Sequence, residues 1–201
     1  MKYELTDETI EVYGRTLHRI KALKDIGTDV KKGDLGGFVE SERNLSQKGN
    51  CWVFNSAMVY DSAKVYDSAM VYDSAEVCSS AMVYDSAKVF GSAMVHNAAE
   101  VYGSATVCGS ATVCGSAKVC GSAEITKSTD VFTVTPIGSR NDTTTFYKAK
   151  GGKIFVKCGC KNTDIDTWFG MVQATHGDNK HAKAYRLAAQ IAKLQISGEE
   201  E

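Results

Sequence analysis

Five consecutive polar residues carry the side chains in this chain that are best suited to holding a ligand. They are Ser139, Arg140, Asn141, Asp142 and Thr143, which put a guanidinium, an amide, a carboxylate and two hydroxyls into one short loop. An arginine beside hydroxyls and backbone amides is a common way to bind phosphate or carboxylate. The same residue types also form turns without any ligand. We therefore predict a ligand- or partner-binding loop anchored by Arg140, and keep turn formation as the alternative.

One histidine in the middle of the chain is a candidate catalytic base. His96 is the only histidine between residues 35 and 137. A general base must reach a substrate pocket, and no long insertion interrupts this part of the chain to form one. A zinc centre built from histidines alone would need three of them. We therefore expect no catalytic residue, and we expect that replacing His96 changes nothing.

Two cysteines and two histidines near the C-terminus have the order of a zinc finger. Cys158 and Cys160 are separated by one residue, and His176 and His181 follow them. A single residue between the cysteines is short for a tetrahedral zinc site, and a predicted helix would end between the histidines. We therefore expect neither a metal nor another cofactor.

These residues lie around a long repeat with a period of six. Valine recurs every six residues from Val53 to Val119, Ile125, Val131 and Ile137 continue the phase, and a small residue follows four positions later each time. Since strand residues alternate between two faces, this pattern predicts short strands joined by corners at the Asp-Ser, Gly-Ser and Asn-Ala pairs. Three such sides close a coil of 18 residues, and stacked coils pair as parallel strands.

The repeats VYDSAK, VYGSAT and VCGSAK resemble the hexapeptide-repeat left-handed parallel β-helix. The left hand is what the resemblance implies. Residues 17–54 are similar to the opening segment of bacterial and prophage proteins of this group. Residues 136–196, with GSRNDT, CGC and THG, are similar to a C-terminal module of phage-encoded proteins. Because many hexapeptide-helix proteins are trimeric acyltransferases with a catalytic histidine, an acyltransferase-like enzyme stays an alternative.

The predicted fold is mainly β, a left-handed parallel β-helix with a small α+β (ββαα) module. Residues 1–34 would form an N-terminal β cap, residues 35–137 the β-helix and residues 138–201 the module. In the module, two strands flank KGGK, one helix is capped by a box of Thr163 and Asp166, and a second helix follows Asn179. These helices are expected to end at Gly177 and Gly198. One face of the second helix collects its apolar residues, Ala184, Leu187, Ala188, Ile191 and Leu194.

Aromatic residues recur in two columns on the outside of the predicted coils. Residues 18 apart should stack, and this aligns Tyr66, Tyr84 and Tyr102 in one column and Phe54, Tyr72 and Phe90 in another. Stacking along the coils would stabilise the fold. Alternatively, Tyr66, Tyr72, Tyr84, Phe90 and Tyr102 form an interface between copies of the chain. We therefore expect the protein to bind other copies of itself, as a dimer or trimer.

Charge and composition exclude some functions. The net charge is −1, so no global basic field attracts nucleic acid or an anionic membrane. No apolar run approaches the roughly 18 residues of a membrane helix, and we expect a cytoplasmic protein of a bacterial host cell.

Cys108, Cys114 and Cys120 would point to different faces, too far apart for disulfides. Asp61, Asp67, Asp73 and Asp85 are scattered over three faces, which argues against a mimic of DNA.

Three functions remain after these observations. The first is a non-enzymatic phage or prophage protein that antagonises a host defence component, or sequesters its anionic nucleotide signal by occupancy. The second is the acyltransferase-like enzyme, and the third is a purely structural oligomeric scaffold. The sequence favours the first, because it shows no catalytic constellation.

Overall fold

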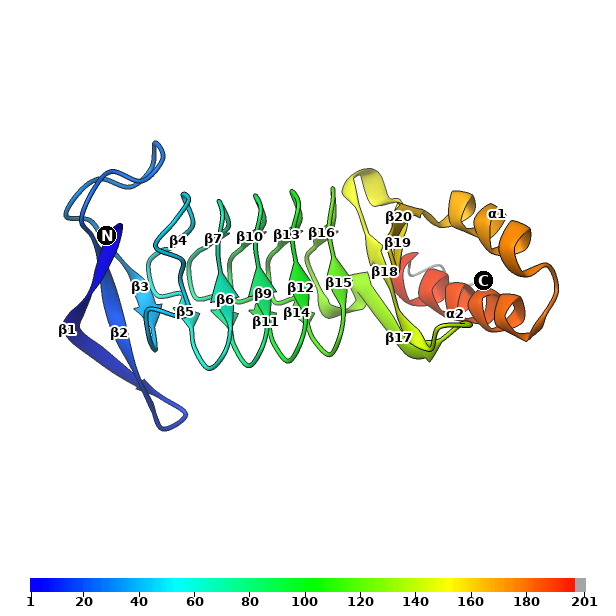
Figure 1. Ribbon diagram of the computed structural model, residues 1–201, viewed down its shortest axis with the longest axis horizontal. Helices are drawn as coiled ribbons and strands as arrows, with labels where there is room; N and C mark the ends of the chain where they lie inside the picture. Colours follow the sequence, from blue (N-terminus) through cyan, green and yellow to red (C-terminus); the bar gives the residue numbers. More distant parts are fainter. Residues whose placement is uncertain (198–201) are drawn as a thin grey trace.

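The computed structural model describes residues 1–197. Figure 1 shows an elongated molecule with an antiparallel hairpin at one end, a stack of coils in the middle and a helix-bearing module at the other end. At the first end, β1 (Tyr3–Val12) pairs with β2 (Arg15–Ala22), and β2 pairs with β3 (Leu35–Val39). The strand β3 then pairs in parallel with the coils. The hairpin therefore continues one sheet of the stack and covers its edge.

The coils form a parallel β-solenoid of about 5 turns. Its strands form three sheets: β3, β5, β8, β11 and β14 lie in one, β4, β7, β10, β13 and β16 in the second, and β6, β9, β12 and β15 in the third, and each of these strands after β3 has two residues. These strands are β4 (Trp52–Val53), β5 (Met58–Val59), β6 (Lys64–Val65), β7 (Met70–Val71), β8 (Glu76–Val77), β9 (Met82–Val83), β10 (Lys88–Val89), β11 (Met94–Val95), β12 (Glu100–Val101), β13 (Thr106–Val107), β14 (Thr112–Val113), β15 (Lys118–Val119) and β16 (Glu124–Ile125).

The strands pair in the predicted register. Val53 pairs with Val71, and Val71 with Val89, so each residue lies over the one 18 positions later. The repeated valines and alanines from Val53 to Ala123 are at most 1% exposed. The period of six therefore produces a core of one valine and one alanine per side, as the sequence predicted.

The corners use the left-handed backbone region that the sequence predicted for Asp, Asn and Gly. Asp61, Asp73 and Asp85 have φ values of 57° to 59°, which small polar residues tolerate better than most. Each of these carboxylates also accepts a hydrogen bond from the backbone N–H 18 residues later, at 3.0 to 3.2 Å. The corner aspartates thus join neighbouring coils.

The two aromatic columns stack as predicted. The rings of Tyr66, Tyr84 and Tyr102 lie parallel, with centroids 4.9 Å apart at both steps. In the other column Phe54 and Tyr72 stack at 4.6 Å, whereas Tyr72 meets Phe90 edge-on at 6.5 Å. All six side chains are half-buried. The columns therefore stabilise the stack, while their use as an interface stays a prediction.

The C-terminal module is an antiparallel sheet covered by two helices. Its strands are β17 (Val131–Ile137), β18 (Asp142–Lys148), β19 (Ile154–Cys158) and β20 (Lys161–Asp164), which pair in chain order. The helices are α1 (Ile165–His176) and α2 (Lys180–Ser197). Strands β18 and β19 are the predicted pair around KGGK. The last parallel strand is β16, however, and residues 131–137 belong to the module although we expected repeats there.

The helix ends agree with the sequence in part. Asp164 caps α1, since its carboxylate accepts the backbone N–H of Thr167 at 2.9 Å. The predicted capping box of Thr163 and Asp166 was therefore wrong by one residue. Gly177 ends α1 as predicted. Asn179 precedes α2 and accepts the N–H groups of two residues in its first turn, whereas the predicted end at Gly198 lies outside the described residues.

The module docks on the last coil through its second strand. Thr145 accepts the backbone N–H of Lys118 at 3.0 Å, and the Tyr147 hydroxyl contacts the Cys120 thiol at 3.4 Å. Tyr147 is fully buried and belongs to the solenoid core. The module also has its own core, formed by the sheet and both helices around Phe146 and Trp168. Within residues 1–197, no helix combines the length and apolarity needed to cross a bilayer.

Candidate functional site

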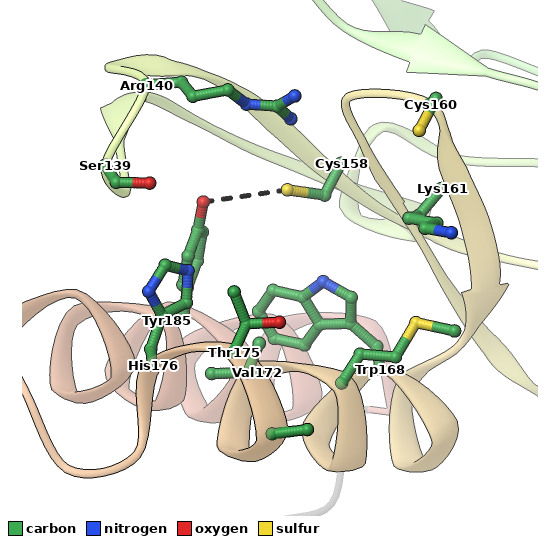
Figure 2. A pocket seen from close by; sticks show the side chains of 12 residues that line it. Ser139, Arg140, Cys158, Cys160, Lys161, Trp168, Val172, Thr175, His176 and Tyr185 are labelled. Carbon is green, nitrogen blue, oxygen red and sulfur yellow. Dashed lines mark hydrogen bonds between the residues drawn. The ribbon is translucent and has the colours of Figure 1, made fainter.

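A cavity of about 560 Å³ opens in the C-terminal module between the strand connections and the two helices. This volume is within the range of small-molecule sites. Figure 2 shows the side chains that line it, which come from both helices, from β19 and β20, and from the connections between the strands. Its lining consists of Ser139, Arg140, Cys158, Cys160, Lys161, Trp168, Met171, Val172, Ala174, Thr175, His176 and Tyr185.

The floor of the cavity is aromatic and rigid. Trp168 is 3% exposed. It meets Phe146 edge-on at 5.4 Å and Tyr185 edge-on at 5.2 Å, so its ring is fixed from two sides. Asp164 caps the helix four residues before Trp168, and Val172 follows one turn after it on the same face. A floor held in this way can receive a flat apolar group without reorganising.

Tyr185 connects α2 to the end of β19. Its hydroxyl lies 3.7 Å from the Cys158 sulfur, and the Thr144 hydroxyl donates to the same sulfur at 3.4 Å. Burial, with Cys158 and Asp142 nearby, raises the pKa of Tyr185 to about 12, although the Arg140 charge acts in the opposite direction. The phenol therefore stays protonated at neutral pH. Cys158 accordingly has hydroxyl neighbours rather than a base.

Two cations stand at the rim of the cavity without partners. Arg140 lies in the turn between β17 and β18, and Lys161 begins β20. Neither side chain makes an ion pair or a hydrogen bond with any residue in the described part of the chain. The Arg140 guanidinium lies over the backbone of Gly159, where a Cβ atom would overlap it. Both charges are therefore free for an anionic ligand.

The remaining polar groups of the lining are also free hydrogen-bond donors. The Trp168 indole nitrogen points into the cavity in Figure 2, between Cys158 and Lys161. The indole N–H and the hydroxyls of Ser139 and Thr175 form no hydrogen bond within residues 1–197. With Arg140 and Lys161, they make a lining rich in donors. Such a lining matches a ligand with many acceptor atoms.

The predicted binding loop divides between the cavity and the turn. Ser139 and Arg140 line the cavity, whereas Asn141 completes the turn and Asp142 and Thr143 begin β18. Asn141 has a positive φ of 50° and donates its N–H to Gly138, and Asp142 accepts the N–H of Thr143. The Thr143 hydroxyl donates to Thr135. Local hydrogen bonding accounts for Asn141, Asp142 and Thr143. Ligand binding by Ser139 and Arg140 stays a prediction.

The cysteines and histidines of the zinc pattern do not converge on one point. Cys158, Cys160 and His176 line the cavity, and the ring of His181 lies 5.9 Å from that of His176. No group of three potential metal ligands occurs among the residues that the structure describes. His96, the candidate base, is half-buried on a corner of the solenoid and does not line this cavity.

Sequence reasoning missed most of the cavity. Trp168, Tyr185 and Lys161 come from α1, α2 and β20, and no local pattern indicates that these elements meet. A partial signal existed in α1, where Trp168, Val172 and Thr175 share a face at helical spacing. That face indicates which side of the helix is covered, but not what opposes it.

The predicted interface residues are spread along the solenoid, away from the cavity. One of them, Tyr102, lies near the module, where the Lys157 ammonium is 6.0 Å from its ring centroid. Comparison with known proteins gave no relative: the chain matches no protein-family model and no curated protein.

Proposed function

We propose that this protein is a non-enzymatic binding protein that captures a nucleotide in the cavity of its C-terminal module. The observation that carries the proposal is the pair of unpartnered cations, Arg140 and Lys161, on the rim of an aromatic cavity. A phosphate would accept hydrogen bonds from the Arg140 guanidinium and lie close to the Lys161 ammonium.

The rest of the lining supports a nucleotide rather than a simple anion. A base would lie against the apolar surface of Trp168, Met171 and Val172, as aromatic groups do in small-molecule sites. Its acceptor atoms would meet the indole N–H and the hydroxyls of Ser139 and Thr175. A phosphate or sulfate alone would leave this part of the cavity empty.

Occupancy without turnover is part of this proposal, and the surroundings of Cys158 support it. The Cys158 thiol, one of two thiols in the lining, is next to the hydroxyls of Thr144 and Tyr185. Nucleophilic catalysis requires a base at hydrogen-bond distance from the nucleophile. A bound nucleotide would be retained unchanged, which is how a protein removes a signal from solution.

The left hand of the solenoid comes from the resemblance in the repeats, and the biological setting comes from the resemblances of residues 17–54 and 136–196. The solenoid is a left-handed hexapeptide β-helix that supports the module, and the protein belongs to a phage or prophage acting in the cytoplasm of its bacterial host. There it antagonises a host defence system by sequestering the nucleotide that the system uses as a signal. The acyltransferase alternative would need His96 in a substrate site.

Calorimetric titration of the full chain with nucleoside mono-, di- and triphosphates, cyclic nucleotides and cyclic dinucleotides tests the proposal. At least one class should bind, and both its nucleoside and inorganic phosphate should bind much more weakly. Arg140→Ala should weaken binding at least about thirtyfold, because a desolvated charge-assisted contact contributes about 2 kcal/mol or more. Lys161→Ala should weaken binding by a smaller factor, since its exposed charge is screened.

Two control variants accompany this titration. Arg43→Ala removes another exposed arginine without an ion pair in the described chain, and His96→Ala removes the candidate base. Both should bind like the wild type. The proposal fails if no nucleotide binds, or if Arg140→Ala binds as tightly as the wild type.

A further inference from the structure

Helix α2 has a row of apolar side chains on the face turned away from the core. Leu187, Ile191 and Leu194 are 61%, 52% and 60% exposed. With about 100° per residue, they fall within an arc of about 60°. The residues that α2 buries, among them Ala182, Ala189 and Ala192, lie on the opposite side of the helix. We call Leu187, Ile191 and Leu194 the outer stripe of α2.

The outer stripe has the spacing of a helix-pairing seam. The steps of four and then three residues place Leu187 and Leu194 at d positions and Ile191 at an a position of a heptad. Ala184 continues the seam one step earlier and is half-buried. An isolated exposed leucine needs no explanation, but three aligned branched side chains on one helix match a partner helix.

The charges of the helix are arranged unevenly along its length. Residues 180–197 contain four Lys or Arg residues and no Asp or Glu. Arg186 and Lys193 pair with Asp178 and Asp166. Lys180 and Lys183, in the first turn, have no ion pair in the described chain and lie on the side of the outer stripe. In the sequence, three glutamates at 199–201 follow the helix.

We propose that the outer stripe pairs antiparallel with the same stripe of a second copy, around a two-fold axis near Ile191. This arrangement places Leu187 against Leu194 of the partner subunit, so the contact is self-complementary. It also directs Lys180 and Lys183 toward the end of the partner's helix, where the chain continues into three glutamates. The two lysines then lie beside the negative end of the partner's helix dipole at both ends of the pair.

A parallel pair of the same stripes has no such complementarity. Lys180 and Lys183 would then lie beside the same two lysines of the partner subunit, and like charges at this distance repel. Charge therefore selects the antiparallel arrangement. Because the stripe is short, the buried area is below that of a standard interface. We expect a reversible dimer with a dissociation constant on the order of 10 µM.

Sedimentation velocity of the full chain between 1 and about 200 µM tests this dimer. The wild type should shift from monomer to dimer over that range. Ile191→Glu should stay monomeric throughout, because the two new carboxylates would face each other across the axis. Leu35→Glu is the matched control, since Leu35 is 56% exposed on β3, and it should dimerise like the wild type. Circular dichroism should show both variants folded.

A charge exchange tests the antiparallel orientation. The variant Lys180→Glu with Lys183→Glu should weaken the dimer at least about tenfold. Adding Glu199→Lys, Glu200→Lys and Glu201→Lys should restore it. A wild type that is monomeric at about 200 µM, or a dimer that survives Ile191→Glu, overturns the interface. Failure of the charge exchange to restore the dimer overturns the orientation. Neither result bears on nucleotide binding, which is measured separately.

Discussion

At the scale of single residues, the most consequential buried charge lies where the solenoid ends. Asp130 is completely buried, and its Oδ2 accepts hydrogen bonds from the Thr126 backbone and hydroxyl and from the Lys127 backbone, at 2.8 to 3.1 Å. Lys148 of the module lies 3.8 Å from the other carboxylate oxygen. Burial alone would raise the pKa of Asp130, but these hydrogen bonds and the lysine lower it. The charged carboxylate therefore fixes the turn that leads into β17.

Asp130→Asn should destabilise the protein by about 1–3 kcal/mol at pH 7, because the neutral amide oxygen accepts these hydrogen bonds more weakly than a carboxylate and the amide NH2 group would face Lys148. The folded pKa of Asp130 is below its unfolded value of about 3.9, so its contribution is complete above that pH. It is lost as the pH falls toward the folded pKa. Urea denaturation at pH 7 and pH 3 should therefore show a difference from the wild type that shrinks in acid.

Asp7→Asn is the control for this measurement, since Asp7 is exposed on β1. It should leave the free energy of unfolding within about 0.5 kcal/mol of the wild type at both pH values. A constant difference for Asp130→Asn between pH 7 and pH 3 would show that its carboxylate acts only through shape.

At the scale of elements, the turn between β17 and β18 holds the cavity open. Gly138 has a φ of +74°, and a Cβ atom there would overlap the Tyr185 hydroxyl. Gly138→Ala should therefore cost the strain of a left-handed alanine and also displace Tyr185, about 2–4 kcal/mol in total. Thermal unfolding measures this loss, and nucleotide affinity should fall with it.

Gly151→Ala separates the two effects of that substitution. Gly151 has a similar φ of +76°, and no atom lies within 4 Å of its would-be Cβ. This variant should carry the backbone strain alone, about 1 kcal/mol. If both variants lose the same amount of stability, the displacement of Tyr185 in Gly138→Ala costs no free energy of unfolding.

Elements also show how far a sequence can predict this structure. The coils were predictable because each side of six residues repeats the same choice of Val, Ala and corner residue. The end of the solenoid was not predictable. Since six is a multiple of two, the repeat pattern also fits the alternation of a longer strand. Val131 keeps this phase in the antiparallel strand β17 and packs against the solenoid core, whereas a register shift between Val134 and Ile137 places Ile137 in the module core. Only the pairing of the strands, parallel or antiparallel, distinguishes a coil of the solenoid from a strand of the module.

The helices and the cavity illustrate a second reason why the sequence alone does not predict the whole structure. The apolar face predicted for α2 exists, but its largest members are the exposed outer stripe, while alanines and Tyr185 contact the sheet. Small residues bury well where a helix lies close to a sheet, and hydrophobicity alone does not reveal that distance. Similarly, the chemistry of Arg140 predicts an anion-binding residue, whereas Trp168 and Lys161 join it in the cavity lining only through tertiary packing.

At the scale of the whole molecule, two cores meet at one junction. The solenoid core is continuous from the hairpin to the last coil and includes Trp52, whereas the module core is built around Trp168. Each coil is hydrogen-bonded to its neighbours, and the hairpin and the module cover the two ends of the stack. In a solenoid, stability grows with the interfaces between neighbouring repeats. The module has no such repetition and a smaller core.

The two tryptophans, one in each core, allow the cores to be followed separately. In Trp52→Phe the fluorescence reports the module through Trp168, and in Trp168→Phe it reports the solenoid through Trp52. We expect the Trp168 signal to change at a lower urea concentration than the Trp52 signal, because the module core is smaller and lacks repetition. Circular dichroism of the wild type should then show two steps, the first with loss of helix. If both tryptophan signals and the circular dichroism change together, the contacts of Tyr147 and Asp130 couple the two cores into one cooperative unit, and the module does not open independently of the solenoid.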